Sequence, residues 1–197
     1  MFLDVGGVML SNGWGHDSRR LAAEKFNLNL SELEDRHHLT FVTYEEGKLT
    51  LKEYLNRVVF YQKHTFTPDQ FKEFMFNQST PFKEMIEFIL KLKEQNRLKI
   101  AVVNNEAREL NEHRIKKFQL NKFVDFYISS CFVHFRKPDA DIFRIALDIA
   151  QVPVEHVVYI ENTGMFVDVA RDLGIRSILH TNYKSTRSEL SLLGLKL

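Results

Sequence analysis

The chain has little of several features that would place it in a special class of protein. Its 197 residues include one cysteine, Cys131, so neither a disulfide framework nor a thiolate metal cluster is expected. Its 27 basic and 26 acidic residues leave a formal net charge of +1, which gives no electrostatic reason to expect nucleic acid or an anionic membrane as a partner. No apolar run approaches the ~18 residues of a transmembrane helix, and no signal peptide is recognised. These absences predict a soluble, cytoplasmic protein.

The residues that are present have the proportions of an ordinary globular protein. Hydrophobic residues make up 44% of the chain and charged residues 27%, and the length suffices for one core with a small second lobe. Many of the 17 phenylalanines fall between Phe41 and Phe88. Aromatic residues at helical spacing are typical of a packed core, so this stretch is expected to form a compact helical lobe.

Helix-start signals occur repeatedly in the same region. They are Ser31-x-x-Glu34, Thr50-x-x-Glu53 and Thr67-Pro68-Asp69-Gln70. The first two match the capping box, and the third places proline at the first helical position. No strand pattern is evident between Ser18 and Gln78, so the region is predicted to be all-helical.

From residue 82 onward the pattern alternates between helix and strand. The expected helices are 82–95, 106–118, 140–150 and 166–173, and the expected strands are 98–103, 123–128, 156–160 and 177–179, with 1–5 as the first strand. Such alternation predicts right-handed βαβ units and a parallel sheet. We therefore expect a Rossmann-like α/β core at 1–13 and 82–197, with an all-helical cap inserted after the first strand at 14–81.

The most informative residue is Asp4, an acid inside the apolar run 2–10. At the C-terminal end of a buried strand it would lie in the crevice where open α/β sheets bind their ligands. Gly6 and Gly7 follow, and they let the backbone approach a ligand closely. Burying an unpaired carboxylate costs several kcal/mol, so Asp4 either serves as a nucleophile or ligand or ends the strand in solvent. Because Asp4 lies so close to Met1, further residues are expected before Met1.

Polar residues also follow three later strands of the expected sheet. They are Asn104-Asn105, Arg136-Lys137-Pro138-Asp139 and Glu161-Asn162-Thr163-Gly164. Because the carboxyl ends of parallel strands meet at one edge of a sheet, these residues should converge on Asp4. A carboxylate, amide donors, a lysine and a second acid are the groups that phosphoryl transfer through a carboxylate nucleophile needs, together with oxygen ligands for Mg²⁺.

In these segments the chain resembles the haloacid dehalogenase (HAD) superfamily, in the subfamily with a helical, C1-type cap between the first and second motifs. The segments that carry the resemblance are Phe2-Leu3-Asp4-Val5-Gly6-Gly7-Val8, Ile100-Ala101-Val102-Val103-Asn104-Asn105, Arg136-Lys137-Pro138-Asp139-x-Asp141-Ile142-Phe143, and Val158-Tyr159-Ile160-Glu161-Asn162 with Ala170-x-x-Leu173-Gly174-Ile175. Each motif alone is weak, but their order and spacing span nearly the whole chain. The lysine–proline–aspartate segment is the most specific of them.

The resemblance implies roles for the residues around a phosphoryl group. Asp4 matches the nucleophile that forms an aspartyl intermediate, and Lys137 matches the lysine that stabilises the nucleophile and the transferred group. Asn104 falls where the family usually has a serine or threonine bonded to the phosphoryl oxygens, and its amide could still donate. Asn105 either joins it at the substrate or only caps the helix that begins near Glu106.

The resemblance also implies a Mg²⁺ site formed by Asp4, the backbone carbonyl of Gly6, Glu161 and Asn162. The family usually has an acid where Asn162 stands, and Phe166 replaces a polar or acidic residue common one helical turn later. Formal negative charge would then come from Asp4 and Glu161 alone. Because affinity for hard cations follows ligand charge, Mg²⁺ is expected to bind weakly.

Gly6 departs from the pattern in a second way, because phosphatases of the family usually place another aspartate there. Glycine cannot act as a general acid, and general acid–base help is typically a factor of ~10²–10⁴. Any activity is therefore expected to favour good leaving groups, as in anomeric sugar, acyl or aryl phosphates. The missing aspartate would also have activated water in the second step, so a long-lived aspartyl-phosphate on Asp4 is expected.

These features predict Mg²⁺-assisted hydrolysis of a small phosphomonoester, with the cap closing over the site. The alternative is a catalytically impaired family member that binds a phosphorylated metabolite or a protein partner, because Gly6, Asn104, Asn162 and Phe166 all depart from the pattern. A third interpretation is a metal-free 2-haloacid dehalogenase, against which Glu161 argues, since an acid at that point has a metal to serve. The sequence predicts neither the physiological substrate nor the oligomeric state.

Surface or packing positions, and not catalytic or metal-binding roles, are favoured for His16, His37 and His38 and for the cysteine. Adjacent residues on a helix point apart, so His37 and His38 are expected on exposed surface and not at a metal. His16, near Trp14, could face the substrate, although a surface position is favoured. Cys131 is expected to be an unreactive small residue after the third strand.

Overall fold

The computed structural model describes residues 1–195 and has at its centre a five-stranded sheet of order β3-β2-β1-β4-β5. The strands are β1 (Phe2–Leu3), β2 (Ala101–Asn104), β3 (Phe126–Ser129), β4 (Val158–Glu161) and β5 (Arg176–Leu179). All neighbouring strands are parallel, which confirms the predicted Rossmann-like α/β core. The carboxyl ends of all strands therefore share one edge of the sheet.

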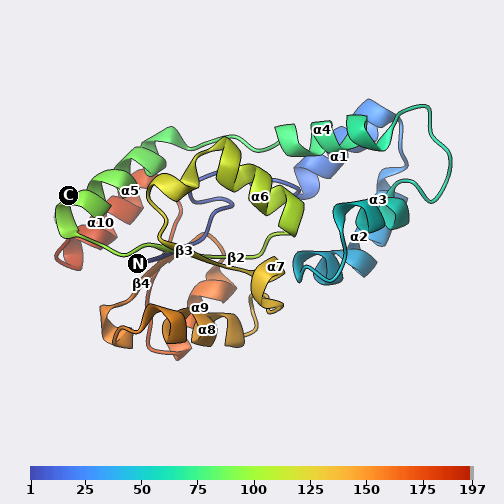
Figure 1. Cartoon of the computed structure of the whole chain (residues 1–197). Coiled ribbons are helices and arrows are strands. Elements are labelled where there is room, and N and C mark those ends of the chain that lie inside the picture. Colours follow the sequence, from blue (N-terminus) through green and yellow to red (C-terminus); the bar gives the residue numbers. More distant parts are fainter. Residues whose placement is uncertain (196–197) are drawn as a thin grey trace.

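Helices cover both faces of the sheet, because successive side chains of a strand point to opposite faces and both faces are apolar here. On one face lie α5 (Lys83–Asn96), α6 (Arg108–Lys117) and α10 (Tyr183–Leu192), and on the other lie α8 (Asp141–Ala150) and α9 (Gly164–Asp172) (Figure 1). Leu3 of β1 packs into the first layer and Phe2 into the second. The sheet is thus enclosed on both faces and open to a ligand only at its edges.

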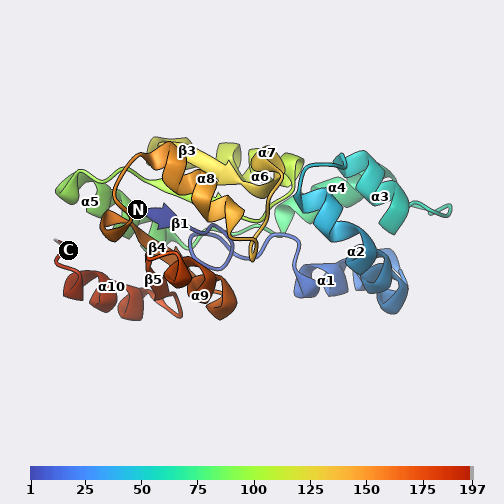
Figure 2. The same cartoon turned by 90° about the horizontal axis from the view of Figure 1, so that it is seen from below.

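The segment after β1 forms a group of helices beyond one end of the sheet, here called the helical lobe (Figures 1 and 2). Its helices are α1 (His16–Phe26), α2 (Leu30–Glu45), α3 (Leu51–Val58) and α4 (Pro68–Asn77). They bury a shared core that includes Tyr54, Phe71 and Met75. Every residue of 18–78 is described and none is in a strand, as predicted, while the exact cap boundaries at 14 and 81 stay predictions. No helix among residues 1–195 is long and apolar enough to cross a membrane.

Two neighbouring chain segments join the helical lobe to the sheet. The Ser11 N–H donates to the Thr80 carbonyl at 2.8 Å, and the Thr80 N–H donates to Ser11 Oγ at 2.9 Å. A second contact lies at the end of α2, where the hydroxyl of Ser130 in α7 (Ser130–Val133) donates to the Glu45 carbonyl at 2.7 Å. Gly47 has a φ of +68°, and a Cβ at this position would lie 2.4 Å from the carbonyl oxygen of Cys131 in α7. Glycine is therefore required where the lobe meets the core.

The predicted helix caps are right at two places and wrong at one. Thr50 and Thr67 each form the expected capping box at the start of α3 and α4. The cap of α2 is Asn29 and not Ser31, since the Asn29 side chain accepts a hydrogen bond from the third helical N–H. The Glu34 carboxylate is instead bonded to an arginine of α1, so it is not available to complete a capping box with Ser31.

Several element boundaries also differ from the predictions. The strand expected at 98–103 begins at Ala101, because the Ile100 N–H donates at 2.7 Å to a carboxylate oxygen of Asp125. The helix expected at 106–118 begins at Arg108, so Glu106 lies in the loop that follows β2. The first strand is shorter than 1–5, and α10 has no counterpart among the predicted elements.

Gly7 is expected to be intolerant of any side chain. Its φ is +79°, and an added Cβ would lie 2.1 Å from the Asn162 amide. Gly7→Ala should destabilise the protein by about 1–3 kcal/mol through backbone strain alone, with the clash adding to the loss. A fall in melting temperature of about 2–4 °C for each kcal/mol is expected for a chain of this size. Gly164→Ala is the matched control, because nothing lies within 4 Å of the Cβ position there. Equal melting temperatures for the two variants would contradict the requirement for glycine at position 7.

Candidate active site

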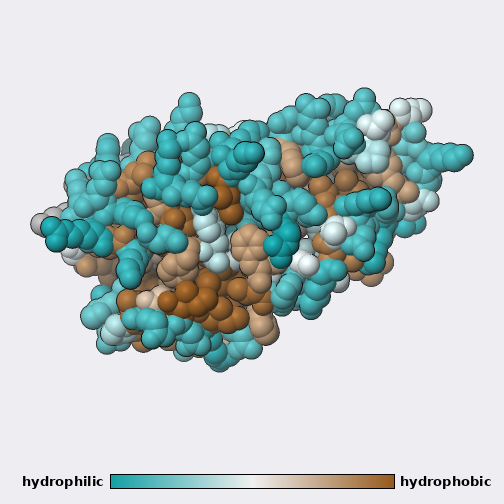
Figure 3. Space-filling view, viewed as in Figure 1, coloured by the Kyte–Doolittle hydropathy of each residue, from teal (hydrophilic) through white to brown (hydrophobic). Residues whose placement is uncertain are grey.

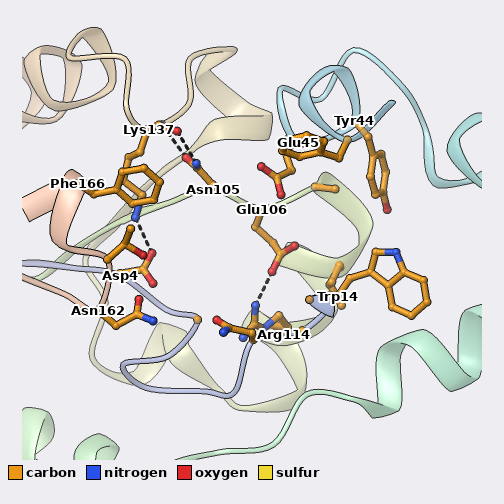
Figure 4. A pocket seen from close by; sticks show the side chains of 18 of the residues that line it. Asp4, Trp14, Tyr44, Glu45, Asn105, Glu106, Arg114, Lys137, Asn162 and Phe166 are labelled. Atoms are coloured by element: carbon orange, nitrogen blue, oxygen red, sulfur yellow. Dashed lines mark hydrogen bonds and ion pairs between the residues drawn. The ribbon is translucent and has the colours of Figure 1, made fainter. Parts of the chain in front are cut away.

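A cavity of about 250 Å³ lies between the carboxyl edge of the sheet and the helical lobe (Figure 4). The residues predicted for the site that line this cavity are Asp4, Gly6, Asn105, Lys137, Glu161 and Asn162. Asn104 does not line it. Residues from four distant parts of the chain are thus brought together, because β1, β2 and β4 are neighbours in the sheet and all end at this edge.

The Lys137 ammonium lies at the centre of the site and is 1% exposed. Its Nζ donates to Asp4 Oδ1 at 2.7 Å and to Glu161 Oε2 at 2.6 Å, and also to the Tyr159 hydroxyl and the Val103 carbonyl. Burial alone would lower the pKa of Lys137, but the two carboxylates outweigh it and raise that pKa. The lysine therefore stays charged and holds the two acids together.

Asp4 follows β1 and presents its carboxylate to the cavity (Figure 4). Burial raises the pKa of Asp4 to about 6, although Lys137 opposes this shift. The carboxylate is ionised above that pH and is largely shielded from solvent, because the residue is only 7% exposed. A desolvated, ionised carboxylate beside a fixed ammonium is suited to attack an electrophilic phosphorus.

Glu161 ends β4 and is fully engaged by its neighbours. Its Oε2 accepts hydrogen bonds from Lys137 and from the Tyr159 hydroxyl, and its Oε1 accepts one from the Thr163 N–H at 2.9 Å. The residue is 1% exposed. Its main contact is therefore with the lysine, and it is less free to bind a cation than its position in the sequence implied.

The Asn162 amide determines how a cation would fit beside these groups. One end of the amide lies 2.9 Å from Glu161 Oε1 and 3.1 Å from the Gly6 carbonyl oxygen. With its NH₂ end turned there, the amide donates to both oxygens. With its oxygen turned there, three oxygens converge without a proton between them, which is a ligand set for a hard cation.

A Mg²⁺ ion at this place would depend on uncharged ligands as well as acids. No group of three or more His, Cys, Asp or Glu side chains suited to a metal occurs in residues 1–195. The Gly6 carbonyl and the Asn162 amide oxygen would complete a set that includes the Asp4 carboxylate. The donor chemistry fits the ion, with less negative charge than a set made of acids supplies.

The two asparagines at the end of β2 point in different directions. Asn105 Nδ2 donates to the Lys137 carbonyl and Asn105 Oδ1 accepts from the Lys137 N–H, both at 2.8 Å, so Asn105 holds the lysine loop in place. The idea that Asn105 caps the next helix is wrong, because the cap of α6 is Ala107. Asn104 is buried, and its Nδ2 donates to Asn111 Oδ1 at 3.4 Å. This places the Asn104 amide away from the cavity, where the expected contact with a phosphoryl group is not available to it.

His37 corrects another expectation, because it is not an exposed surface residue. It is half-buried, lines the cavity, and its Nδ1 lies 2.8 Å from the Tyr54 hydroxyl. Burial, assisted by the positive charge of Arg19, lowers the pKa of His37 to about 3. His38 is exposed, as adjacent positions on a helix require. The imidazole of His37 is therefore a neutral part of the cavity wall.

The cavity also contains residues that sequence reasoning did not assign to the site. The wall from the helical lobe and its connection contains Trp14, Phe41, Tyr44 and Glu45, and the core adds Glu106 and Arg114 (Figure 4). Glu106 directly follows Asn105 after β2, so the signal that identified Asn105 could also have identified it. No comparable signal marks the aromatic residues, because their positions depend on how the helices of the lobe pack.

Comparison with known proteins gives a family match over most of the chain. The model of the family described as haloacid dehalogenase-like hydrolase matches residues 19–180. A curated relative is the putative pyrophosphatase PpaX of Caldanaerobacter subterraneus subsp. tengcongensis, 29% identical over 96 residues, which are 49% of this chain and 43% of the relative. Another is the phosphorylated carbohydrates phosphatase of Thermotoga maritima, 25% identical over 133 residues, which are 68% of this chain and 57% of the relative. The chain thus spans less than two thirds of the length of either.

Solved structures share the fold at low sequence identity. A HAD family enzyme from Bacteroides thetaiotaomicron, solved with magnesium and inorganic phosphate, superposes with a TM-score of 0.74 at 17% identity, over 90% of this chain and 91% of that one. L-2-haloacid dehalogenase from Xanthobacter autotrophicus superposes with a TM-score of 0.63 at 14% identity, over 96% of this chain and 81% of that one. At such identities the likeness concerns the fold alone, and it includes both phosphate-binding and dehalogenating proteins.

Removing the central lysine should destabilise the fold strongly. In Lys137→Met the Asp4 and Glu161 carboxylates lose their shared counter-ion while both stay buried. Breaking a buried ion pair in this way costs about 3–5 kcal/mol, to be measured by urea unfolding at neutral pH. Lys48→Met is the control, since Lys48 pairs with Glu46 at the surface and should contribute less than about 1 kcal/mol. A loss no greater than that of the control would contradict the central role of Lys137.

An acid introduced at position 162 should strengthen magnesium binding. Asn162→Asp adds a charged oxygen beside Glu161 Oε1 and the Gly6 carbonyl, so Mg²⁺ affinity should rise by about tenfold or more, because affinity follows ligand charge. The metal-dependent rise in melting temperature at several Mg²⁺ concentrations measures this. Asn77→Asp, at the exposed end of α4, should behave as the parent. The assignment fails if both variants respond to Mg²⁺ like the parent.

Proposed function

The chain belongs to the family of haloacid dehalogenase-like hydrolases, and on that premise we propose that it is a phosphatase of small phosphomonoesters. The observation that carries the proposal is the buried contact of one ammonium, Lys137, with both Asp4 and Glu161 in a single cavity. Two phosphatase names among the curated relatives support the same reaction class. Asp4 is the proposed nucleophile, and the helical lobe is the proposed cap over it.

The proposed reaction proceeds in two phosphoryl transfers. An Asp4 carboxylate oxygen attacks phosphorus, the bond to the leaving oxygen breaks, and an aspartyl-phosphate forms. Water then attacks that phosphorus and restores the carboxylate. Lys137 stabilises the negative charge on the phosphoryl oxygens as well as the ionised form of Asp4. If Mg²⁺ is held by Asp4, the Gly6 carbonyl and the Asn162 amide oxygen, it supplies positive charge at the phosphoryl oxygens.

The charges of the cavity favour this reaction over dehalogenation of a 2-haloacid. A 2-haloacid carries a carboxylate that needs a cation or several donors once it is desolvated. Among the described residues that line the cavity, the cations are Lys137 and Arg114, and both are already bonded to carboxylates. A phosphomonoester accompanied by Mg²⁺ brings its own counter-ion, so it does not require a further free cation.

A catalytically impaired, ligand-binding protein is the second candidate. The observation that favours it is the direction of Asn104, whose amide contacts Asn111 and not the cavity. The full engagement of Glu161 points the same way. Such a protein would bind a phosphorylated metabolite in the same cavity without turning it over.

Phosphate release from a panel of sugar, acyl and aryl phosphates, measured with Mg²⁺, tests the proposal. Asp4→Asn should reduce release on every active substrate to the level without protein, because the amide cannot form the aspartyl-phosphate. In the parent protein, acid quenching during turnover should trap a covalent phosphoryl group that mass spectrometry assigns to Asp4.

Asp168→Asn is the matched control, since Asp168 is an exposed acid on α9, and it should retain parent activity. No release above the Asp4→Asn level on any substrate would overturn the phosphatase proposal. Saturable binding of the same phosphates in calorimetry would then favour the ligand-binding protein.

A further inference from the structure

We propose that Glu106 gives a proton to the leaving group and then takes one from the attacking water, a task that Gly6 has no side chain to perform. This inference rests on the proposed phosphatase function and adds a catalytic residue to it. Expulsion of an unactivated alkoxide at neutral pH requires a proton. The geometry of the cavity points to Glu106 as the group that supplies it.

The space beside Gly6 is bordered by Asn12 and, slightly farther away, by Arg114, the partner of Glu106. A Cβ built on Gly6 would lie 3.1 Å from Asn12 Oδ1 and 3.9 Å from Arg114 Nη1. The same Arg114 Nη1 is bonded to Glu106 Oε2. The arginine nitrogen that bonds Glu106 therefore lies within contact distance of the Cβ position of residue 6, close to the backbone that follows Asp4.

Glu106 reaches this place from a firmly held part of the core. It lies in the short loop between β2 and α6, and its N–H donates to Ser130 Oγ at 2.9 Å. Its side chain is 12% exposed and points into the cavity that Asp4 also lines (Figure 4). The Arg114 guanidinium also donates to the Ser11 carbonyl, which fixes the ion pair to the connection between core and helical lobe.

The other titratable groups of the cavity are less suited to proton transfer. Glu161 is engaged by Lys137, by the Tyr159 hydroxyl and by a backbone N–H. Glu45 comes from the helical lobe, and its Oε2 accepts two hydrogen bonds from one arginine of the core. The His37 ring is neutral and its Nδ1 faces the hydroxyl of a lobe tyrosine. Glu106 is also paired with an arginine, but both partners belong to the core, and Glu106 lines the same cavity as Asp4.

The surroundings of Glu106 raise its pKa above that of an ordinary glutamate. Burial raises the pKa of Glu106 to about 7, Arg114 opposes the rise, and the Glu45 carboxylate adds to it. Tyr44 on α2 and Cys131 on α7 also face it, and burial raises the pKa of both, so both remain neutral. An acid with a pKa near the working pH can both release and recover a proton.

The two steps balance with Glu106 as proton carrier. In the first, the Asp4 oxygen bonds to phosphorus, the bond to the leaving oxygen breaks with its electron pair on that oxygen, and the Glu106 proton completes the alcohol. In the second, the water oxygen bonds to phosphorus, its proton passes to the Glu106 carboxylate, and the bond to Asp4 breaks. The products are the alcohol and hydrogen phosphate, and both carboxyl groups return to their starting states.

A series of phosphomonoesters that differ in leaving-group pKa tests the proposal with Glu106→Gln. Glutamine keeps an oxygen for Arg114 but cannot donate an acidic proton. For alkyl phosphates kcat/KM should fall by about 10²–10⁴-fold, while p-nitrophenyl phosphate, whose leaving group needs no proton, should lose less than about fivefold. The parent should show a weak dependence on leaving-group pKa, and Glu106→Gln a steep one.

Two further readouts separate a catalytic from a structural role. In the parent, kcat/KM for alkyl phosphates should decline above pH about 7, close to the pKa to which burial raises Glu106, and this decline should be absent in Glu106→Gln. With p-nitrophenyl phosphate, whose first step needs no proton, the aspartyl-phosphate should accumulate in the variant, because water is no longer deprotonated in the second step. Glu112→Gln, which changes an exposed acid on α6, the helix that follows the Glu106 loop, is the control and should match the parent.

An equal loss on all substrates with an unchanged pH profile would overturn the role of Glu106 while leaving the phosphatase proposal intact. If Glu106→Gln does not fold, Glu106→Asp provides the test, since it keeps the ion pair with a shorter reach and should lose activity mainly on alkyl phosphates. Absence of turnover by the parent on every substrate would overturn the proposed function itself, and the role of Glu106 with it.

Discussion

The whole site depends on one electrostatic constraint, the burial of the Lys137 ammonium. An ammonium that is 1% exposed is stable only with its charge compensated and its donors bonded. Asp4 from the end of β1 and Glu161 from the end of β4 supply the charge, and the Asn105 amide holds the lysine loop from β2. These three strands are neighbours in the sheet, so a shift of any one of them would separate the lysine from a partner. The fold and the candidate site are in this sense specified by the same contacts.

Much of this arrangement could be predicted from the sequence, because it follows from topology. Alternating helix and strand patterns require parallel strands, and parallel strands bring the residues after them to one edge; this was sufficient to select Asp4, Lys137 and Glu161. What could not be predicted depends on side-chain direction and on packing of the lobe. Asn104 turns toward α6 although its neighbour Asn105 turns toward the lysine, and no pattern in the sequence distinguishes them. The burial of His37 likewise depends on the packing of α2 against α3.

The core and the helical lobe contribute different kinds of side chain to the wall of the cavity. The core supplies charged groups whose positions are fixed by strands and by mutual ion pairs. The helical lobe supplies aromatic surface, with Trp14 Nε1 donating to the Tyr54 hydroxyl and Tyr44 stacked on Tyr54 at 4.2 Å. Under the proposed phosphatase function, phosphoryl transfer would use the charged groups of the core, since charge must be placed accurately. The aromatic surface of the lobe would contact the leaving group and select it by shape.

The paired junction at Ser11 and Thr80 has a consequence for how such a chain can evolve. Both connections of the helical lobe leave the core at adjacent points and are hydrogen-bonded to each other. The two ends of the inserted segment are therefore as close together as the ends of a short turn. Insertions whose ends lie close together leave the register of the host sheet unchanged. A lobe of different length or sequence could therefore be exchanged at this point while the strands and their ion pairs persist. Specificity can then diversify by replacement of a whole segment, with the residues at the sheet edge inherited intact.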